Sequence, residues 1–311
     1  MQSPGFWTSH YVTCTDPADV ARAAETISVS SSGETLELLH FPRGEDVPSI
    51  LVSPGSGGHA HVFAELAYLI HRLGYRVFVM PKHGGRTVDQ LVVRHRDVIG
   101  HIAARYGDRL GVYGEGLGGY VAFYAALART PFMGSTACQN SPAVLTERSY
   151  HQALLADGGP WARSARRRRI MLPLGRRLVR VAPWLRVPVS SYLSWRDLID
   201  TRDGVRDLEH RLVLDGYLND PDFDRWYPLS AVMSLVDTPP PAPVESLTIP
   251  TMFVVASEGP TPDYIADLYD RLPVARKRIV HVEGSVYWML SHPQQAATLI
   301  CDWFTASLGP A

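Results

Sequence analysis

GVYGEGLGGYVAFYAAL, which spans residues 111–127, decides the fold. It opens with the end of an apolar run that begins at Arg109, passes through the turn GEGLG, and continues as small apolar residues up to Arg129. A short apolar run, a tight glycine turn and a longer apolar run are typical of a buried parallel strand that leads into a helix. We therefore predict a strand over residues 109–113 and a buried helix over residues 117–129.

Strands and helices alternate on both sides of this unit. Apolar runs and alternating patterns predict strands, and helical spacing of apolar residues between glycine or proline boundaries predicts helices. The expected strands are residues 26–30, 34–41, 49–53, 76–80, 133–139, 251–256 and 278–282, and the expected helices are residues 60–73, 87–106, 262–272 and 293–306. Sequential strand–helix–strand units predict an α/β fold with a mostly parallel central sheet and helices on both faces.

One long segment interrupts the alternation. Residues 142–247 show no regular pattern and are rich in Arg, Trp and Pro, and the run PPPAP at residues 239–243 is typical of a stiff connection. We predict a core domain formed by residues 1–141 and 248–311, with residues 142–247 inserted after the sixth strand as a helical cap.

Composition points to a small-molecule ligand. The chain has 311 residues, a formal net charge of -1 and a pI near 6.9, which argues against nucleic acid or an anionic membrane as its main partner. No apolar stretch approaches the roughly 20 residues of a membrane span, and no signal peptide precedes the first strand, so we expect a cytoplasmic protein. The three cysteines form no CxxC pair, so we expect no metal and no cofactor. A homodimer stays open.

The turn at residues 114–118 resembles the nucleophile elbow of the α/β-hydrolase superfamily, whose pattern is G-x-S-x-G. Other segments resemble the same family in the expected order. SILVSPGSGGHAHVF (49–63) is similar to the third strand and its oxyanion loop, with Pro54 where the family usually has His. RVFVMPKHGGRT (76–87) is similar to the fourth strand and its loop, and residues 249–273 and 278–293 are similar to the last two strands with their acid and histidine loops.

The resemblance implies that the catalytic triad is missing. The nucleophile position is Gly116, the acid position after the seventh strand is Gly259, and the histidine position after the eighth strand is Tyr287. A serine attacks only when an imidazole takes its proton and a carboxylate orients that imidazole. A phenol, with a pKa near 10, is a poor base at neutral pH. The chain is therefore identified as a triad-less member of the superfamily.

Several groups near these positions are candidates for a remaining function. By resemblance, the backbone N–H groups of Ser56 and Leu117 would form an oxyanion hole, or they keep only an inherited turn geometry. Glu115 and Glu258 neighbour the empty nucleophile and acid positions, and either would transfer protons if burial raised its pKa. The alternative is a helix-end charge for Glu115 and a solvated loop charge for Glu258.

Histidines, aromatic residues and arginines give weaker signals. His59 would face the pocket as an acid or a donor, or it lies on a helix surface, and the same alternatives hold for His83. Tyr287 and Trp288 would supply a hydrogen bond and an aromatic wall, or fill the space of the lost histidine. The run Arg166–Arg169 would receive a phosphate or a carboxylate, although a solvated cap surface is the more common role of such a run.

We favour a non-hydrolytic enzyme of the cyclase, lyase or isomerase type, which positions an apolar carbonyl-containing metabolite over Gly116. One alternative is a catalytically inert protein that binds a small molecule or acts as a scaffold. The other is an esterase-like hydrolase with a rearranged site. Gly116, Ser56, Leu117 and Trp288 are the expected substrate contacts.

Overall fold

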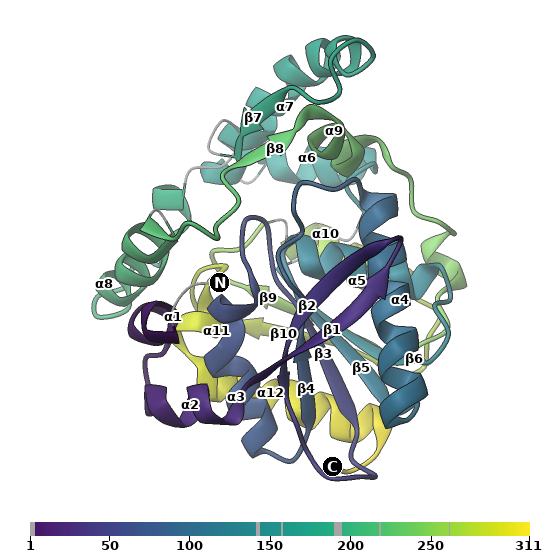
Figure 1. Ribbon diagram of the computed structural model, residues 1–311. Coiled ribbons are helices and arrows are strands. Elements are labelled where there is room, and N and C mark those ends of the chain that lie inside the picture. Colours follow the sequence, from purple (N-terminus) through teal and green to yellow (C-terminus); the bar gives the residue numbers. More distant parts are fainter. Residues whose placement is uncertain (1–3, 141–143, 157, 190–194, 218, 261) are drawn as a thin grey trace.

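The structure is a computed structural model that describes residues 4–140, 144–156, 158–189, 195–217, 219–260 and 262–311 (Figure 1). Its centre is an eight-stranded sheet in the order β1-β2-β4-β3-β5-β6-β9-β10, in which β1 and β2 are antiparallel to their neighbours and the remaining pairs are parallel. The strands are β1 (Glu25–Ser31), β2 (Glu34–Phe41), β3 (Ser49–Ser53), β4 (Arg76–Val79), β5 (Leu110–Glu115), β6 (Met133–Gln139), β9 (Thr251–Ala256) and β10 (Lys277–Val282). The predicted mostly parallel α/β sheet is confirmed.

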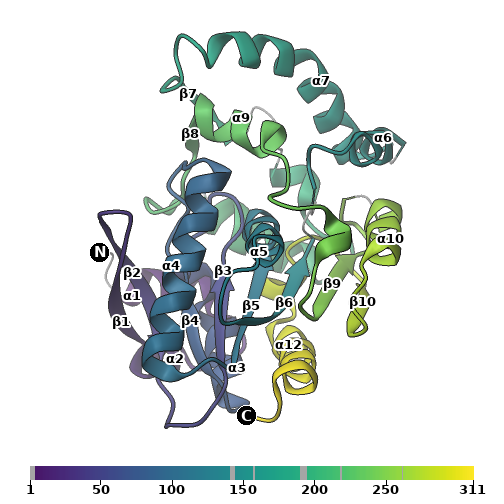
Figure 2. The same ribbon diagram turned by 90° about the vertical axis from the view of Figure 1, so that its right-hand side faces the viewer.

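Helices cover both faces of the sheet (Figure 2). One face carries α3 (Ala64–Arg72) and α12 (Pro293–Leu308), and the other carries α4 (Val88–Tyr106), α5 (Leu117–Leu127) and α10 (Pro262–Arg271). Alternate residues of each central strand serve the two faces: in β3, Ile50 and Val52 join the first core cluster and Leu51 joins the second. All five residues of β3 are buried, because helices remove both faces of a parallel sheet from water.

The described residues before β1 carry no predicted element. They form two short helices, α1 (Pro4–Tyr11) and α2 (Pro17–Ala23), and the segment between them is held by one buried carboxylate. Glu65 accepts hydrogen bonds from the backbone N–H groups of Thr13, Cys14 and Thr15 and from the hydroxyls of both threonines. The helix expected over residues 60–73 is also divided, into the 3-10 turn η1 (Ala60–Phe63) and α3.

We use the name cap segment for the described residues of the predicted insertion, which are 144–156, 158–189, 195–217 and 219–247. They project beyond the carboxyl edge of the sheet (Figures 1 and 2). The segment contains α6 (Arg148–Ala156), α7 (Pro160–Leu178), β7 (Arg186–Pro188), η3 (Trp195–Leu198), α8 (Arg206–Glu209), the π-helix η4 (His210–Tyr217), β8 (Trp226–Pro228), α9 (Leu229–Asp237) and η5 (Val244–Ser246). β7 and β8 pair as a separate antiparallel ribbon. Whether this segment is an independent domain stays a prediction.

The long helix α7 is the main element that the sequence pattern did not reveal. Pro160 lies at its first turn, where the missing N–H group costs nothing, and Ala, Arg, Leu and Met are strong helix formers. Pro173 inside the helix and the arginine run hide its apolar spacing. Among the described residues, no helix has both the length and the apolar character needed to cross a membrane.

Candidate active site

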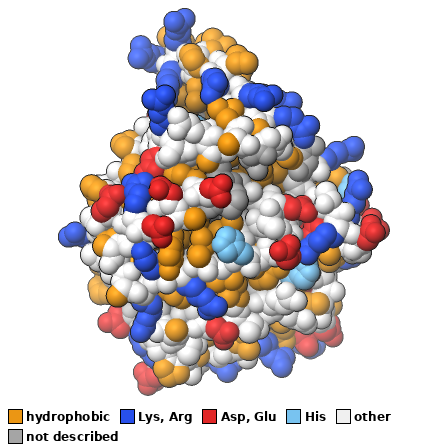
Figure 3. All heavy atoms as spheres, turned by 180° about the vertical axis from the view of Figure 1, so that it is seen from behind, with side chains coloured by type: hydrophobic (Ala, Val, Ile, Leu, Met, Phe, Trp, Pro, Cys, Tyr) orange, Lys and Arg blue, Asp and Glu red, His pale blue; other side chains and the backbone are white. Residues whose placement is uncertain are grey.

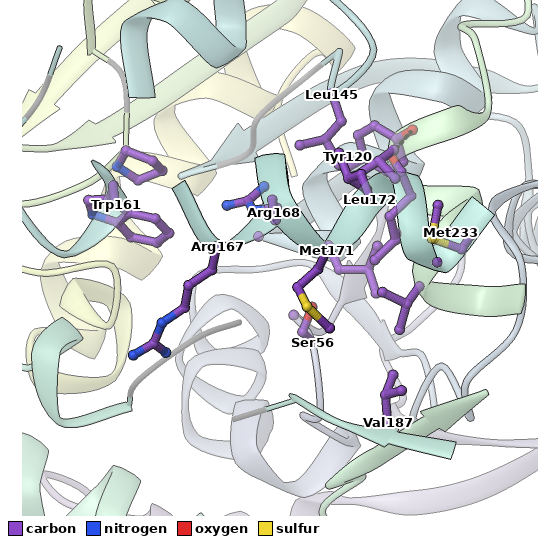
Figure 4. A pocket seen from close by; sticks show the side chains of 18 of the residues that line it. Ser56, Tyr120, Leu145, Trp161, Arg167, Arg168, Met171, Leu172, Val187 and Met233 are labelled. Atoms are coloured by element: carbon purple, nitrogen blue, oxygen red, sulfur yellow. Dashed lines mark hydrogen bonds between the residues drawn. The ribbon is translucent and has the colours of Figure 1, made fainter. Parts of the chain in front are cut away.

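A cavity of about 630 Å³ lies between the carboxyl edge of the sheet and the cap segment. Figure 4 shows side chains from the loop after β3 (Ser56), from α5 (Tyr120) and from the cap segment (Met171 and Met233) converging on it. Most lining residues are apolar, and the described lining residues include no histidine and no cysteine. A volume of this size is typical of small-molecule sites.

Gly116 forms the floor of the cavity, at the turn between β5 and α5. Its φ of +50° is a conformation that glycine adopts freely and that strains other residues. Its N–H group donates a 2.9 Å hydrogen bond to the carbonyl of Gln139, which ties the turn to the end of β6. Among the described residues, a Cβ atom here would meet only the Cα of Gly55, at 3.9 Å. The cavity therefore has room at the position that the resemblance assigns to the nucleophile.

Glu115 is the last residue of β5, and its side chain lines the cavity beside Gly116. The carboxyl group lies against Gly55, because a Cβ atom at residue 55 would stand 1.9 Å from Glu115 Oε2. Among the described residues it has no hydrogen-bond or ion-pair partner. Burial away from water raises the pKa of Glu115 to about 8. At neutral pH this carboxyl group is therefore mostly a neutral acid that faces the cavity.

Two residues that the resemblance assigns to the oxyanion hole line the same cavity. Ser56 and Leu117 both line the cavity, and in the described part of the chain no acceptor is bonded to either N–H group. Leu117 is the first residue of α5, where free N–H groups and the helix dipole favour an oxygen that carries negative charge. The loop after β3, which contains Ser56, is held by the cap segment, because the N–H of Gly57 donates a 2.7 Å hydrogen bond to the hydroxyl of Tyr227.

Tyr287 also lines the cavity, and it faces a second phenol that the sequence did not single out. Tyr217 comes from the π-helix η4, and the two ring centroids are 6.3 Å apart in an edge-to-face arrangement. Burial raises the pKa of both hydroxyls well above the usual value, and Glu115, which is ionised at the high pH where a phenol titrates, adds to the effect. Neither hydroxyl has a hydrogen-bond partner among the described residues. Both phenols are therefore neutral donors at neutral pH, and neither is a base.

The loop that holds Tyr287 is fastened by a buried carboxylate of the cap segment. Glu209 accepts hydrogen bonds from the hydroxyls of Ser285, at 2.8 and 2.9 Å, and of Ser291, at 3.0 Å. The N–H of Tyr287 in turn donates to the Ser285 hydroxyl at 3.0 Å. Glu209 itself is fully buried. This chain of contacts fixes the tyrosine where the resemblance would place a histidine.

Asn140 lies beside Gly259, the position that the resemblance assigns to the catalytic acid. Its side-chain oxygen accepts a 2.9 Å hydrogen bond from the N–H of Ala256, and its amide nitrogen donates a 3.1 Å bond to the carbonyl of Val286. A Cβ atom at Gly259 would lie 2.9 Å from that oxygen. The asparagine thus bridges the loops after β9 and β10, and glycine at residue 259 leaves room for the bridge.

Three expected site residues lie elsewhere. His59 Nε2 lies 2.6 Å from a buried Asp220 oxygen that also accepts a hydrogen bond from Tyr11, so His59 belongs to a structural network outside the cavity lining. Glu258 accepts a 3.2 Å hydrogen bond from Thr201 and also lies outside the lining. The ring of Trp288 stacks on His292 instead of forming the expected aromatic wall.

His83 is buried rather than exposed on a surface. His83 donates from Nε2 to the carbonyl of Pro54 at 2.6 Å, and its ring stacks on that of His95 with centroids 6.1 Å apart. His95 Nε2 lies 2.8 Å from the hydroxyl of Ser53 and its Nδ1 lies 2.9 Å from the carbonyl of Leu91. All these groups are buried, so they support the loop after β3 from below and do not reach a ligand.

The cavity is also lined by four aromatic residues that were not predicted to be site residues. Tyr120, Tyr217, Trp161 and Trp195 all line it, from four separate elements. No sequence motif marks them, since only the tertiary fold brings them together. Among the described residues, no cluster of three or more His, Cys, Asp or Glu side chains is arranged to hold a metal ion.

Comparison of whole structures settles the fold. No family model matches the sequence, and no curated protein was found to match it. The structure is similar to Alpha/beta hydrolase GrgF from Penicillium sp. sh18, with a TM-score of 0.63, 13% identity, and coverage of 92% of this chain and 99% of that one. The chain has the α/β-hydrolase fold.

Lipases share the same architecture. The monoacylglycerol lipase of Paleococcus ferrophilus aligns with a TM-score of 0.64 and 16% identity, over 88% of this chain and 99% of that chain. A monoglyceride lipase variant from Saccharomyces cerevisiae aligns with a TM-score of 0.66 and 11% identity, over 91% and 95% of the respective chains. At such low identity the likeness establishes the fold and leaves the chemistry to the site itself.

Proposed function

We propose that this chain is a non-hydrolytic enzyme of the cyclase, lyase or isomerase type, and that Glu115 transfers the proton. The observation that supports this proposal is the place of the Glu115 carboxyl group, whose pKa is raised by burial to about 8, in an apolar cavity that Ser56 and Leu117 also line. Serine-hydrolase chemistry has little support, because Gly116 offers no nucleophile and the described lining residues offer no imidazole. An apolar carbonyl compound is the ligand class that fits such a lining.

A carboxyl group can act as acid and base in one step. The substrate carbonyl oxygen accepts hydrogen bonds from Ser56 and Leu117, which stabilise the charge that develops on it. The Glu115 hydroxyl gives its proton to this oxygen while a nucleophilic atom of the same substrate bonds to the carbonyl carbon. The proton lost by that nucleophile returns to the other Glu115 oxygen. The enzyme is regenerated, the product is an isomer of the substrate, and no water is consumed.

Intramolecular aldol closure of undecane-2,6-dione tests the proposal, because its methyl-ketone carbon can bond to the second carbonyl and form a six-membered ring. We expect ring closure above the buffer rate, and a loss of about 10²- to 10⁴-fold in Glu115→Gln, the usual size of a general acid–base contribution. Glu258→Gln, which changes the same kind of side chain outside the cavity lining, is the matched control. Equal rates for wild type and Glu115→Gln would refute a role of Glu115.

The two alternatives have distinct outcomes. Tight retention of apolar ligands with no turnover of any carbonyl probe would favour an inert binding protein. Hydrolysis of a decanoyl ester above background, lost in Glu115→Gln, would favour a rearranged esterase. A cytoplasmic location and a homodimer stay predictions.

A further inference from the structure

Two members of the arginine run of α7 line the cavity. Arg167 and Arg168 belong to the lining, whereas Arg166 and Arg169 lie outside it. Arg168 is partly buried, and the other three arginines of the run are exposed. Figure 4 shows both lining arginines beside Trp161. The helical turn divides the run, because successive residues point in different directions around a helix axis. A solvated surface role therefore fits Arg166 and Arg169 but does not account for the place of Arg167 and Arg168 in the cavity lining.

The lining arginines have no carboxylate partner. Among the described residues, the ion pairs include neither Arg167 nor Arg168. Residues 158–196 contain ten arginines and no acidic residue. Figure 3 shows basic side chains gathered on the projecting cap, while most of the visible acidic side chains lie on the body. Local charge is thus strongly positive, although the whole chain is close to neutral.

Arg168 is partly buried, with one unused donor. Its Nε atom is buried and has no hydrogen-bond partner among the described residues. The guanidinium lies close enough to the hydroxyl of Tyr150 to offset part of the rise that burial causes in the pKa of that hydroxyl. A buried N–H group without an acceptor is costly. Among the described lining residues, Glu115 has the carboxyl group. Because burial raises its pKa to about 8, it is mostly neutral at neutral pH and does not supply the missing negative charge.

We propose that the cavity takes an amphiphilic ligand whose anionic head, a carboxylate or a phosphate, is bound by Arg167 and Arg168. A guanidinium matches both groups with paired N–H donors. The apolar chain of the ligand would then pass residues such as Met171, Leu178 and Val286 toward the floor. The placement of a reacting carbonyl at Glu115 rests on the proposed function, whereas binding of the head does not.

Binding of three ten-carbon probes tests whether the cavity prefers a ligand with an anionic head. Decanoate and decyl phosphate present the two anions, and decanol presents the same chain without charge. By calorimetry on the full chain, we expect at least one anion to bind about tenfold to a hundredfold more tightly than decanol, the usual size of hydrogen bonds to a charged group. A preference between decanoate and decyl phosphate identifies the anion. Equal affinity of all three probes would overturn the proposal.

A pair of double variants locates the effect. Arg167→Gln with Arg168→Gln should abolish the preference for the anion and leave decanol binding unchanged. Arg166→Gln with Arg169→Gln removes the same charge from the same helix and should keep most of the preference. Equal losses in both double variants would show a general field of the cap and overturn the assignment. Unchanged decanol binding also shows that each variant is folded.

The same measurements separate this inference from the proposed function. Glu115→Gln removes the proton-transfer group and leaves both arginines in place, so it should retain the preference for the anion. An anion preference that persists in a chain without turnover would keep this inference and reject the catalytic proposal. Turnover of the diketone without any anion preference would do the reverse.

Discussion

The carboxyl group of Glu115 packs against the backbone of Gly55, so closely that a Cβ atom at residue 55 would lie 1.9 Å from Glu115 Oε2. The glycine of the loop after β3 therefore makes room for the acid at the end of β5. This contact joins the two segments that the resemblance assigns to the oxyanion loop and the elbow. It holds the acid at the cavity floor, where burial raises its pKa to about 8.

Gly55→Ala should displace the carboxyl group while the fold is kept, since a flexible side chain can move away from the new methyl group. We expect about a hundredfold loss of diketone cyclisation, which is typical when a reacting group is misplaced by about 1 Å. Gly44→Ala is the control, because a Cβ atom there would have no neighbour within 4 Å. Retained activity in Gly55→Ala would show that the position of Glu115 is unimportant.

Glu115→Gln should change how stability depends on pH. A folded-state pKa of about 8 lies above the ordinary value of 4.5, so the folded wild type holds a proton that the unfolded chain releases in this interval. The stability of the wild type relative to the variant should therefore fall as pH rises from about 4.5 to 8, by at most ~1.4 kcal/mol per unit. Urea unfolding at several pH values measures the difference. Parallel curves for the two proteins would contradict the raised pKa.

Acid should destabilise the support beneath the loop after β3. Burial lowers the pKa of His95 to about 4 and that of His83 to about 3, both below the ordinary value of 6.5. The unfolded chain then binds protons first, so stability is full above about pH 6.5 and declines as pH falls toward these values. His95→Gln should remove up to ~1.4 kcal/mol per unit from this slope. An unchanged slope in denaturant titrations would show that His95 does not contribute.

Gly116→Ser tests whether a hydroxyl at the elbow is sufficient for hydrolysis. The side chain has room in the cavity, although φ of +50° would strain it by about 1 to 3 kcal/mol. No histidine is among the described lining residues, and Tyr287 is a neutral phenol, so no group activates the serine. We expect no burst of p-nitrophenol from p-nitrophenyl decanoate. A stoichiometric burst would show that a base is present.

The sheet was predictable because its signals are local. The apolar runs and glycine boundaries at residues 49–53 and 133–139 match β3 and β6 residue for residue. The turn around Gly116 was also predictable, because an apolar run, a glycine turn and a second apolar run are typical of a strand that leads into a helix. α7 was not, because its arginine run and Pro173 hide the periodicity that defines a helix face.

The site was predictable only near the motif. Glu115, Ser56, Leu117 and Tyr287 lie on the cavity because they flank turns of the sheet edge. Tyr217 could not be found, because its place depends on a π-helix in the cap segment. His59 and Trp288 were predicted near the cavity but lie outside its lining for a different reason. His59 contacts Asp220, and the ring of Trp288 stacks on His292.

The protonation state of Glu115 is the central claim, and a ¹³C NMR titration of protein labelled at the glutamate carboxyl carbons measures it directly. The signal absent from Glu115→Gln assigns the resonance. We predict a midpoint near pH 8, because burial raises the pKa of Glu115 to about 8. A midpoint near the ordinary value of 4.5 would mean an ionised carboxylate at neutral pH, and it would contradict the proposed proton donor.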